Sequence, residues 1–302
     1  MELTLWPLVS QPWPALLEVV EQVERLGWYG VAIEDHFMAD GGGFGSVSDP
    51  RFEVTSVLSA LAVATTSLRL TPLVMSATYR HPAVVANWAA TVDQISNGRL
   101  TLGLGAGWQH NEHEQYGIAL GSPGDRIERL DEYCTVVRSL LEQSSTTFAG
   151  SFFTVAVAWC EPKPVQSRLP LLIGGKGDRM LRLIARHADR WNMWAMPSTF
   201  AERSLVLDAA CERIGRDPST LRRSTQALVF LTESPAKAQA FVDAAGGRAA
   251  FAGTAEQFAE LAVKWREVGV DELIVPDWHL GTGAKRAEAI EALTAAVSAS
   301  MA

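Results

Sequence analysis

Residues 68–111 read LRLTPLVMSATYRHPAVVANWAATVDQISNGRLTLGLGAGWQHN, a pattern that predicts a strand, a helix and a second strand. The β-branched and apolar run at 68–74 predicts the first strand. Pro82 loses no helical hydrogen bond in a first turn, and apolar residues recur at helical spacing after it, so we expect a helix at 82–96. Residues 99–105 predict the second strand. Because a helix joins the two strands, they should be parallel, with a right-handed crossover.

The alternation of strands and helices continues through the rest of the chain. Apolar and β-branched runs predict further strands at residues 2–9, 29–33, 169–173, 189–194, 221–231 and 270–276. Periodic apolar positions predict helices at residues 14–26, 52–64, 125–142, 178–187, 199–214 and 284–298, and Thr254 with Gln257 forms a capping box for one more. Eight strands alternating with helices favour an α/β fold, a closed (β/α)8 (TIM) barrel, over an open doubly wound sheet.

One segment, residues 144–168, interrupts this alternation. Aromatic and β-branched residues on either side of a glycine turn at 146–157 suggest a small hairpin, so we expect an insertion before the fifth barrel strand. No linker or shift in composition divides the chain, and we expect a single domain over residues 1–302. The loops at 39–50 and 109–124 and the insertion carry no motif that would identify a substrate.

The bulk composition excludes several classes of protein. The 302 residues include 26 basic and 34 acidic side chains, a net charge of −8 that disfavours binding to nucleic acid. Three scattered cysteines are too few for a disulfide framework or a cysteine-ligated metal, and they suit a reducing compartment. The N-terminus lacks a basic leader, and no run of about 18 apolar residues suggests a membrane span. We therefore expect a cytoplasmic protein.

Asp35 and His36 follow directly after the second predicted strand. In a (β/α)8 barrel this is the rim where active sites assemble. Histidine can donate or accept a proton near neutral pH, and an adjacent carboxylate can orient it or contact a cofactor. The alternative is a solvated loop pair or a helix cap, and the two residues alone leave both interpretations open.

A glycine turn, Gly105-Ala106-Gly107-Trp108, follows the fourth predicted strand, with Asn111 just beyond it. Glycines let a planar ring or a phosphate tail approach the backbone closely, and an asparagine offers both a hydrogen-bond donor and an acceptor. A Gly-x-Gly sequence alone is more often only a tight turn.

A second glycine turn, Gly174-Gly175-Lys176-Gly177, lies between the fifth predicted strand and a helix. Free backbone N–H groups at the helix start, together with the Lys176 ammonium, could hold a phosphate. The turn does not match the P-loop or the dinucleotide fingerprint. A plain strand-to-helix turn is equally consistent with these residues.

Residues 110–114, His-Asn-Glu-His-Glu, lack the order of a zinc-binding helix, so we expect a solvated polar loop and no metal site. Ten tryptophans are many for this length, and some near strand ends could form the wall of a pocket for a flat ring, although core packing is the default. Those near predicted strand ends are Trp6, Trp13, Trp108, Trp194 and Trp278.

Four linked motifs carry a resemblance to a known family. They are Tyr79-Arg80-His81-Pro82-Ala83, Thr91-Val92-Asp93, Ser96-Asn97-Gly98-Arg99 and the run from Leu102 to Trp108. At these spacings the chain resembles the bacterial luciferase-like superfamily of flavin and deazaflavin oxidoreductases. The Gly-Trp ending is closer to the branch that uses coenzyme F420. A second block, Ile173-Gly174-Gly175 followed by 183–192, is also similar to the family.

The resemblance implies roles for individual residues. His36 would be a proton donor beside the flavin-type ring, and a non-prolyl cis peptide would lie near residues 73–76. The 174–176 loop would contact the cofactor's phosphorylated side chain. The implied cofactor-binding residues are Asp35, Met75, Ala106, Gly107, Asn111, Gly174, Gly175 and Lys176.

Trp108 departs from one branch of the family. The deazaflavin sugar-phosphate dehydrogenases that the chain resembles carry a catalytic glutamate at this position. Tryptophan there argues against sugar-phosphate oxidation and for an apolar or aromatic substrate, or a reductase, with Trp108 in the substrate pocket.

The favoured function is therefore hydride transfer between F420 and a small organic molecule, by a protein that the resemblance implies is a homodimer. An FMN-dependent monooxygenase that uses reduced flavin and O2 is the alternative, and a non-catalytic flavin-binding protein is a third reading. A further cation in the groove, such as Arg80, Arg179 or Arg182, would favour F420 because of its acidic tail.

Overall fold

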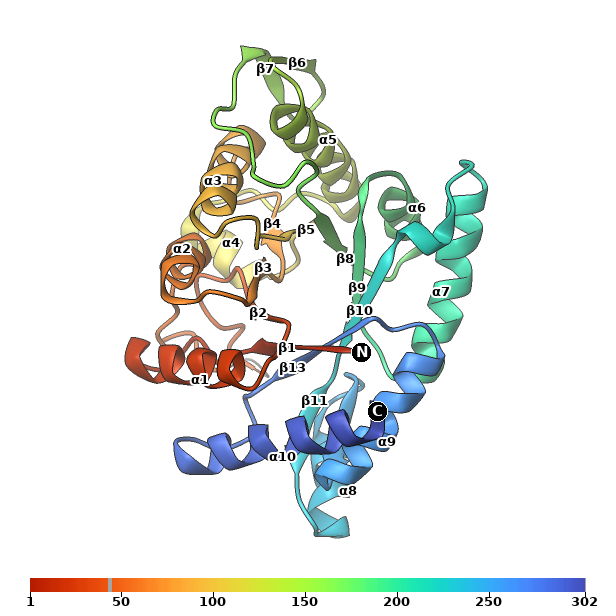
Figure 1. Cartoon of the computed structure of the whole chain (residues 1–302). Coiled ribbons are helices and arrows are strands. Elements are labelled where there is room, and N and C mark those ends of the chain that lie inside the picture. The colour runs from red at the N-terminus through yellow and green to blue at the C-terminus, as the bar shows by residue number, and fades with distance from the viewer. Residues whose placement is uncertain (43–44, 302) are drawn as a thin grey trace.

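The computed structural model describes residues 1–42 and 45–301, so Gly43 and Phe44 of the predicted 39–50 loop, and Ala302, lie outside the described residues. A ring of parallel strands is surrounded by helices (Figure 1). The barrel strands are β1 (Glu2–Trp6), β2 (Gly30–Ile33), β3 (Arg69–Pro72), β4 (Met75–Ser76), β5 (Leu102–Gly105), β8 (Leu171–Gly174), β9 (Arg190–Trp194), β10 (Arg222–Gln226) and β13 (Glu272–Pro276). The helices are α1 (Trp13–Arg25), α2 (Val54–Ala64), α3 (Pro82–Ile95), α4 (His110–Tyr116), α5 (Pro123–Glu142), α6 (Asp178–His187), α7 (Pro197–Glu212), α8 (Pro235–Ala244), α9 (Ala255–Glu267) and α10 (Ala284–Met301).

The sheet closes on itself. Its strand order is β3-β2-β1-β13-β10-β9-β8-β5-β4, and the two ends, β3 and β4, are successive parts of one barrel strand separated by Leu73 and Val74. Closure is completed where Leu70 N donates to Arg99 O and Thr101 N donates to Leu70 O, each at 2.9 Å. The predicted (β/α)8 barrel is confirmed. The division into one domain stays a prediction.

The helix starts follow the local signals in the sequence. Thr254 and Gln257 form the predicted capping box of α9, and Ser122 with Asp125 forms another at α5. His81 caps α3 by accepting from Ala83 N. Each cap satisfies backbone N–H groups that have no partner within the helix.

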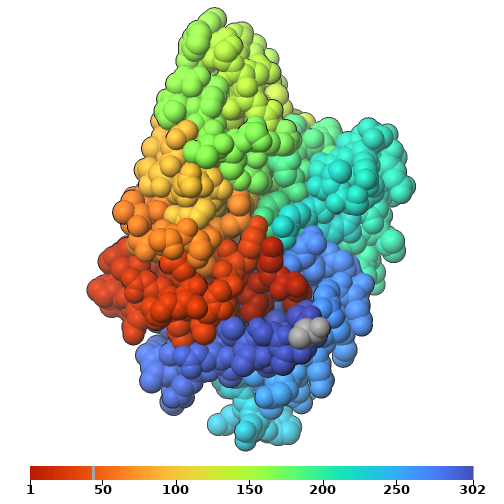
Figure 2. All heavy atoms as spheres, viewed as in Figure 1, coloured from red at the N-terminus to blue at the C-terminus, as the bar shows by residue number. Residues whose placement is uncertain are grey.

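The insertion before the fifth barrel strand is a hairpin, as predicted, made of antiparallel strands β6 (Thr146–Ala149) and β7 (Thr154–Ala158). It projects beyond the barrel at the top of the view (Figure 2). Among the helices of the described residues, none is both long and apolar enough to cross a membrane. The three cysteines are buried free thiols.

The prediction of one strand at 221–231 is wrong in its second half. The chain leaves the barrel after Gln226, and β11 (Leu228–Leu231) pairs with β12 (Ala250–Gly253) in a separate small parallel sheet. Neither α8 nor β12 was predicted from the sequence. A continuous apolar run marks extended backbone without showing where a strand changes sheets, because both sheets bury such residues.

Glu53 caps α2, and its lowered pKa makes its contribution to stability depend on pH. Its carboxylate accepts hydrogen bonds from Ser56 N at 2.8 Å and Thr55 Oγ1 at 2.6 Å, and it pairs with Arg80. Burial opposes ionisation, but the hydrogen bonds from Thr55 and Ser56 prevail and lower the pKa of Glu53 from 4.5 to about 2. Because the folded-state pKa is lowered, its stabilising contribution is present above pH 4.5 and is lost as the pH falls toward 2.

We expect Glu53→Ala to lower the free energy of unfolding by about 1 kcal/mol near neutral pH, the usual effect of losing a helix cap. The difference from wild type should shrink as the pH falls below 4.5. Urea unfolding at several pH values measures this difference. Glu53→Gln keeps an acceptor oxygen but loses the charge, so it separates the contribution of the hydrogen-bonded cap from that of the charge. If the loss of unfolding free energy in Glu53→Ala did not change with pH, the contribution of the ionised carboxylate would be contradicted.

Candidate functional site

A cavity of about 640 Å³ opens at the carboxyl ends of the barrel strands. This is the end at which (β/α)8 barrels carry their sites, and the volume suits a cofactor or drug-sized ligand. Several side chains named from the sequence line it: Asp35, His36, Ala106, Gly107, Trp108, Gly174, Gly175 and Lys176. The loops after β2, β5 and β8 therefore converge on one space, as the barrel topology requires.

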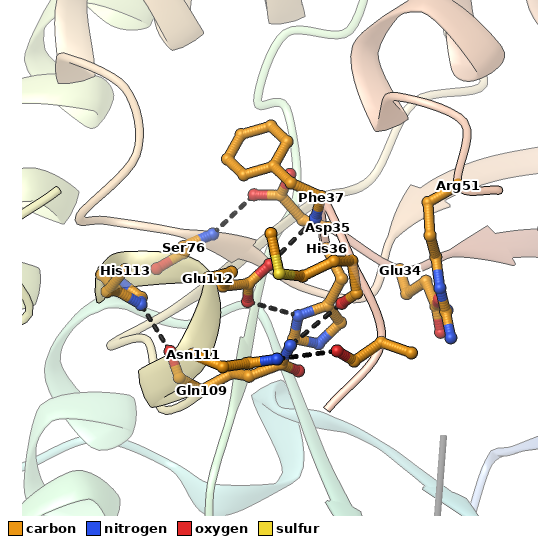
Figure 3. A network of polar contacts seen from close by, with 12 residues as sticks. Glu34, Asp35, His36, Phe37, Arg51, Ser76, Gln109, Asn111, Glu112 and His113 are labelled. Atoms are coloured by element: carbon orange, nitrogen blue, oxygen red, sulfur yellow. Dashed lines mark hydrogen bonds and ion pairs between the residues drawn. The ribbon is translucent and has the colours of Figure 1, made fainter. Parts of the chain in front are cut away.

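His36 is held by Glu112, which the sequence analysis did not single out. Glu112 points from α4 toward the His36 ring (Figure 3), and its Oε1 lies 2.7 Å from His36 Nδ1. Its Oε2 accepts from Phe37 N at 2.9 Å, and the Tyr79 hydroxyl also donates to this carboxylate. The predicted solvated loop at 110–114 is wrong, because these residues belong to a helix and the Glu112 side chain is fully buried.

The charge of Glu112 sets the tautomer of His36. Burial alone would raise the pKa of Glu112, but the hydrogen bonds from His36, Tyr79 and Phe37 N prevail and lower it. An ionised carboxylate can only accept, so His36 Nδ1 carries the proton and donates it to Glu112. Nε2, which no residue in 1–42 or 45–301 hydrogen-bonds, is the nitrogen left for a ligand in the cavity.

Asp35 is held by the protein itself. Its carboxylate accepts from Arg80 NH1 at 2.8 Å and from Ser76 N at 2.9 Å, and Arg80 also pairs with Glu53. Burial raises the pKa of Asp35, and the Arg80 guanidinium opposes that shift. Asp35 therefore ties the end of β2 to β4 and to the start of α2, in addition to lining the cavity.

One wall of the cavity is built around Val74. A non-prolyl cis peptide joins Leu73 to Val74, at the place the resemblance implied. A Cβ on Gly105 would lie 2.5 Å from Val74 Cγ2, whereas a Cβ on Gly174 would lie 3.5 Å from it. Gly107 has φ +80°, and a Cβ there would lie 2.6 Å from Ser76 Oγ. Neighbouring protein atoms therefore require glycine at 105 and 107, whereas a Cβ at 174 would make an ordinary contact with Val74.

Gly105→Ala is therefore expected to destabilise the fold by about 1–3 kcal/mol, since the methyl group must displace Val74 in a packed barrel. Gly174→Ala is the matched control, because its methyl group makes an ordinary contact with the same Val74 side chain. Thermal or urea unfolding of both variants measures the difference. Equal stability of the two would contradict the packing argument.

Two residues named from the sequence do not line the cavity. Met75 is buried in the apolar core. Asn111 Nδ2 donates to Ala39 O at 2.8 Å, and within the described chain its buried Oδ1 has no hydrogen-bond partner. Their roles as cofactor-binding residues stay predictions.

The turn before α6 keeps the features of an anion site. Gly177 precedes the helix without a side-chain cap, so the first backbone N–H groups of α6 remain open to a ligand. Gly175 is fixed on both sides: its N–H donates to Asn192 O at 2.9 Å and its carbonyl accepts from Trp191 Nε1 at 2.7 Å. Lys176 lines the cavity at this point.

The three arginines proposed to distinguish F420 from FMN are not among the cavity-lining residues. Arg80 is occupied by Asp35 and Glu53, and Arg179 pairs with Glu128 at the surface, at 3.4 Å. Within the described chain, the long basic side chains that line the cavity are Lys176 and Arg248.

The tryptophan expectation is correct in part. Trp6, Trp108 and Trp194 line the cavity, and Trp13 and Trp278 do not. Trp108 is half-exposed and meets the His36 ring edge-on, with ring centroids 5.5 Å apart at 79°.

Asn192 and Gln226 also line the cavity and were missed. The signal for them was in the sequence, since each is an amide within a run predicted to be a buried strand. A polar residue in such a run is informative because burial requires that its hydrogen bonds be satisfied.

Comparisons with known proteins identify the family. The family model described as luciferase-like monooxygenase matches residues 2–301. Pyrimidine monooxygenase RutA of Caulobacter segnis is 31% identical over 208 residues, 66% of this chain and 57% of RutA. An uncharacterized protein of Mycobacterium tuberculosis H37Rv is 35% identical over 135 residues, 44% of this chain and 47% of that protein. The chain thus spans about half the length of the curated relatives it matches.

Solved structures show the same fold. An F420-dependent secondary alcohol dehydrogenase in complex with an F420-acetone adduct gives a TM-score of 0.84 at 20% identity, covering 97% of this chain and 98% of that one. A long-chain alkane monooxygenase gives 0.83 at 14% identity, covering 99% and 91%. Together with the family match over nearly the whole chain, these findings establish that the protein belongs to the luciferase-like monooxygenase family.

Proposed function

We propose that the protein is an oxidoreductase that transfers a hydride between coenzyme F420 and a small organic substrate. The observation that carries the proposal is the His36–Glu112 pair, which presents Nε2 of a defined tautomer to the cavity. Moving a hydride to or from a carbonyl or an activated double bond requires a proton to move as well, and a positioned histidine can supply or accept it.

The residues at the site fit a flavin-type cofactor. Val74, with Gly105 and Gly174 beside it, offers a surface that a planar ring can approach closely. Lys176 and the uncapped start of α6 suit a phosphate on the cofactor's side chain. When bound, the deazaflavin would supply the hydride exchange at its central carbon. The protein would position the cofactor and the substrate and polarise the reacting bond.

Each residue then has a physical task. Glu112 keeps the proton on Nδ1 of His36, so that Nε2 accepts a proton from the substrate or, once protonated, returns one. The Trp108 ring covers His36 from one side and limits access of water to the imidazole. Asp35 holds the β2 rim in place through Ser76 and Arg80.

The alternative is an FMN-dependent monooxygenase that uses reduced flavin and O2. It is favoured by the 31% identity to a pyrimidine monooxygenase and by the absence of Arg80, Arg179 and Arg182 from the cavity lining. The third reading, a flavin-binding protein without activity, predicts cofactor binding with no turnover.

The test is a titration of the purified protein with oxidised F420 and, separately, with FMN at fixed ionic strength. Trp6, Trp108 and Trp194 line the cavity, so binding should quench intrinsic fluorescence. Preferential binding of F420 supports the proposal, and preferential binding of FMN places the monooxygenase first. Binding of neither would overturn the cofactor assignment.

A homodimer and a cytoplasmic location stay predictions.

A further inference from the structure

Two carboxamide side chains meet on the neighbouring strands β9 and β10, with Asn192 in the middle of β9 and Gln226 at the carboxyl end of β10. In the parallel register, Asn192 lies opposite Ser224, and Trp194 lies opposite Gln226. Asn192 Nδ2 donates to Gln226 Oε1 at 2.8 Å and to Ser224 Oγ at 3.0 Å. Both hydrogens of the Asn192 amide and one lone pair of Gln226 Oε1 are used in these bonds.

The remaining amide atoms face the cavity. Within the part of the chain that the structure describes, Asn192 Oδ1 accepts no hydrogen bond and Gln226 Nε2 donates none. Neither atom belongs to the fully buried polar atoms that lack a partner, so solvent reaches both, although each side chain is only 3% exposed. Both residues line the cavity, which is therefore the space those atoms reach. The pair therefore offers the cavity one acceptor and one donor.

The two residues of this pair lie at different distances from the proposed cofactor surface: Asn192 is in register with Gly174 on the adjacent strand β8, whereas Gln226 lies one strand further from it. From the β3–β4 strand, which carries Val74, β10 is reached through β2, β1 and β13 in one direction and through β5, β8 and β9 in the other. Gln226 thus lies across the barrel from Val74. A ring resting on Val74 would leave the space in front of the amide pair to the substrate.

The surface beside Gln226 includes two tryptophan rings, and Arg248 lines the same cavity. Trp194 lies beside Gln226 in the register, and its ring centroid is 5.6 Å from that of Trp6, with the planes at 50°. Flat apolar faces beside a donor and an acceptor suit a planar ring that carries one polar edge.

We propose that Asn192 and Gln226 form a recognition edge for a planar lactam or imide, whose ring N–H donates to Asn192 Oδ1 and whose adjacent carbonyl accepts from Gln226 Nε2. This inference rests on the proposed function of the same cavity, because it assigns the cofactor to the Val74 side. It gives the substrate class: a cyclic amide, such as a pyrimidinedione or an aromatic imide.

The probe is phthalimide, compared with N-methylphthalimide, which keeps the ring and both carbonyls but lacks the N–H. Calorimetric titration of the cofactor-loaded protein should give a Kd at least about tenfold lower for phthalimide, since the methylated compound leaves Asn192 Oδ1 unpaired. Gln226→Met and Asn192→Leu should weaken phthalimide binding and, for Asn192→Leu, bring the ratio of the two Kd values close to one.

The control is Thr225→Val. Thr225 directly precedes Gln226 on β10 and donates to Met193 O and Ala195 O, so the loss of its hydroxyl should leave the ratio of the two Kd values unchanged. Gln226→Glu keeps the shape of the side chain and replaces the donor Nε2 by an oxygen. It tests the role of Nε2 if Gln226→Met does not fold, and thermal unfolding of each variant shows whether it folds.

Equal affinity of the two probes for the wild-type protein overturns the proposal. It is also overturned if Asn192→Leu and Gln226→Met weaken F420 or FMN binding and leave the phthalimide ratio intact, since the amide edge would then contact the cofactor. The same titration on cofactor-free protein separates the two hypotheses: discrimination between the probes without binding of any cofactor rejects the proposed function and retains the amide edge.

Discussion

His36→Ala is expected to lower kcat by about 10²- to 10⁴-fold, the range for loss of a positioned general acid or base. The reason is geometric: in this structure Glu112 fixes Nδ1, and Nε2 is directed to the cavity. Cofactor affinity should change little, because the proposed contacts to the ring and phosphate come from Val74, the glycine turns and Lys176. Single-turnover kinetics with the preferred cofactor, beside a fluorescence titration, measure both quantities.

His279→Ala is the matched control for this prediction. His279 is exposed and is not among the residues lining the cavity, so its loss should leave both kcat and cofactor affinity unchanged. If His36→Ala retained full activity, proton transfer through His36 would be rejected. If no variant or wild-type protein turned over while F420 or FMN still bound, the non-catalytic reading would take first place.

The fold was accessible from the sequence because its signals are local. Pro82 starts a helix, the capping box at Thr254 and Gln257 starts another, and β-branched runs mark strands between them. Each signal depends on a few consecutive residues, and the right-handed crossover rule then leaves few topologies. The prediction of one strand at 221–231 failed after Gln226 because it also relied on local signals. The pairing of β11 with β12 depends on residues far from each other in the chain.

Site residues could be predicted from the sequence only where a residue of a reactive or ligand-binding type directly follows a predicted strand. Asp35, His36 and the two glycine turns each directly follow a strand, so barrel topology alone brings them together. Glu112 could not be found in this way. Its partner His36 is 76 positions away, and its polar neighbours in 110–114 gave the pattern of a solvated segment. Burial of a charge depends on tertiary packing, which local composition does not report.

Glu112→Gln is expected to lower kcat by about 10- to 100-fold, the range found when the carboxylate that orients a metal-bound histidine is removed. An amide has one acceptor oxygen where the carboxylate has two. If that oxygen accepts from Phe37 N, the NH2 group meets His36 Nδ1 and favours the opposite tautomer, with the proton on Nε2. KM and cofactor affinity should change little, because Glu112 is fully buried and is not among the residues that line the cavity.

The pH dependence of stability tests whether Glu112 is ionised in the folded protein, and kcat tests its positioning role. The pKa of Glu112 is lowered in the folded state from 4.5, against the effect of burial, by hydrogen bonds from His36, Tyr79 and Phe37 N. Its stabilising contribution is therefore present above pH 4.5 and is lost as the pH falls through the lower folded-state value. Glu112→Gln should remove that contribution, so its unfolding free energy should depend less on pH in the acid range than that of the wild type.

The matched control is Glu114→Gln, an exposed position on the same helix, which should change neither kcat nor the acid dependence of stability. Glu112→Asp keeps the charge and should recover part of kcat, although its shorter side chain lengthens the contact with Nδ1. Wild-type kcat in Glu112→Gln, with lower stability, would leave Glu112 a structural residue and would require another group to set the tautomer of His36.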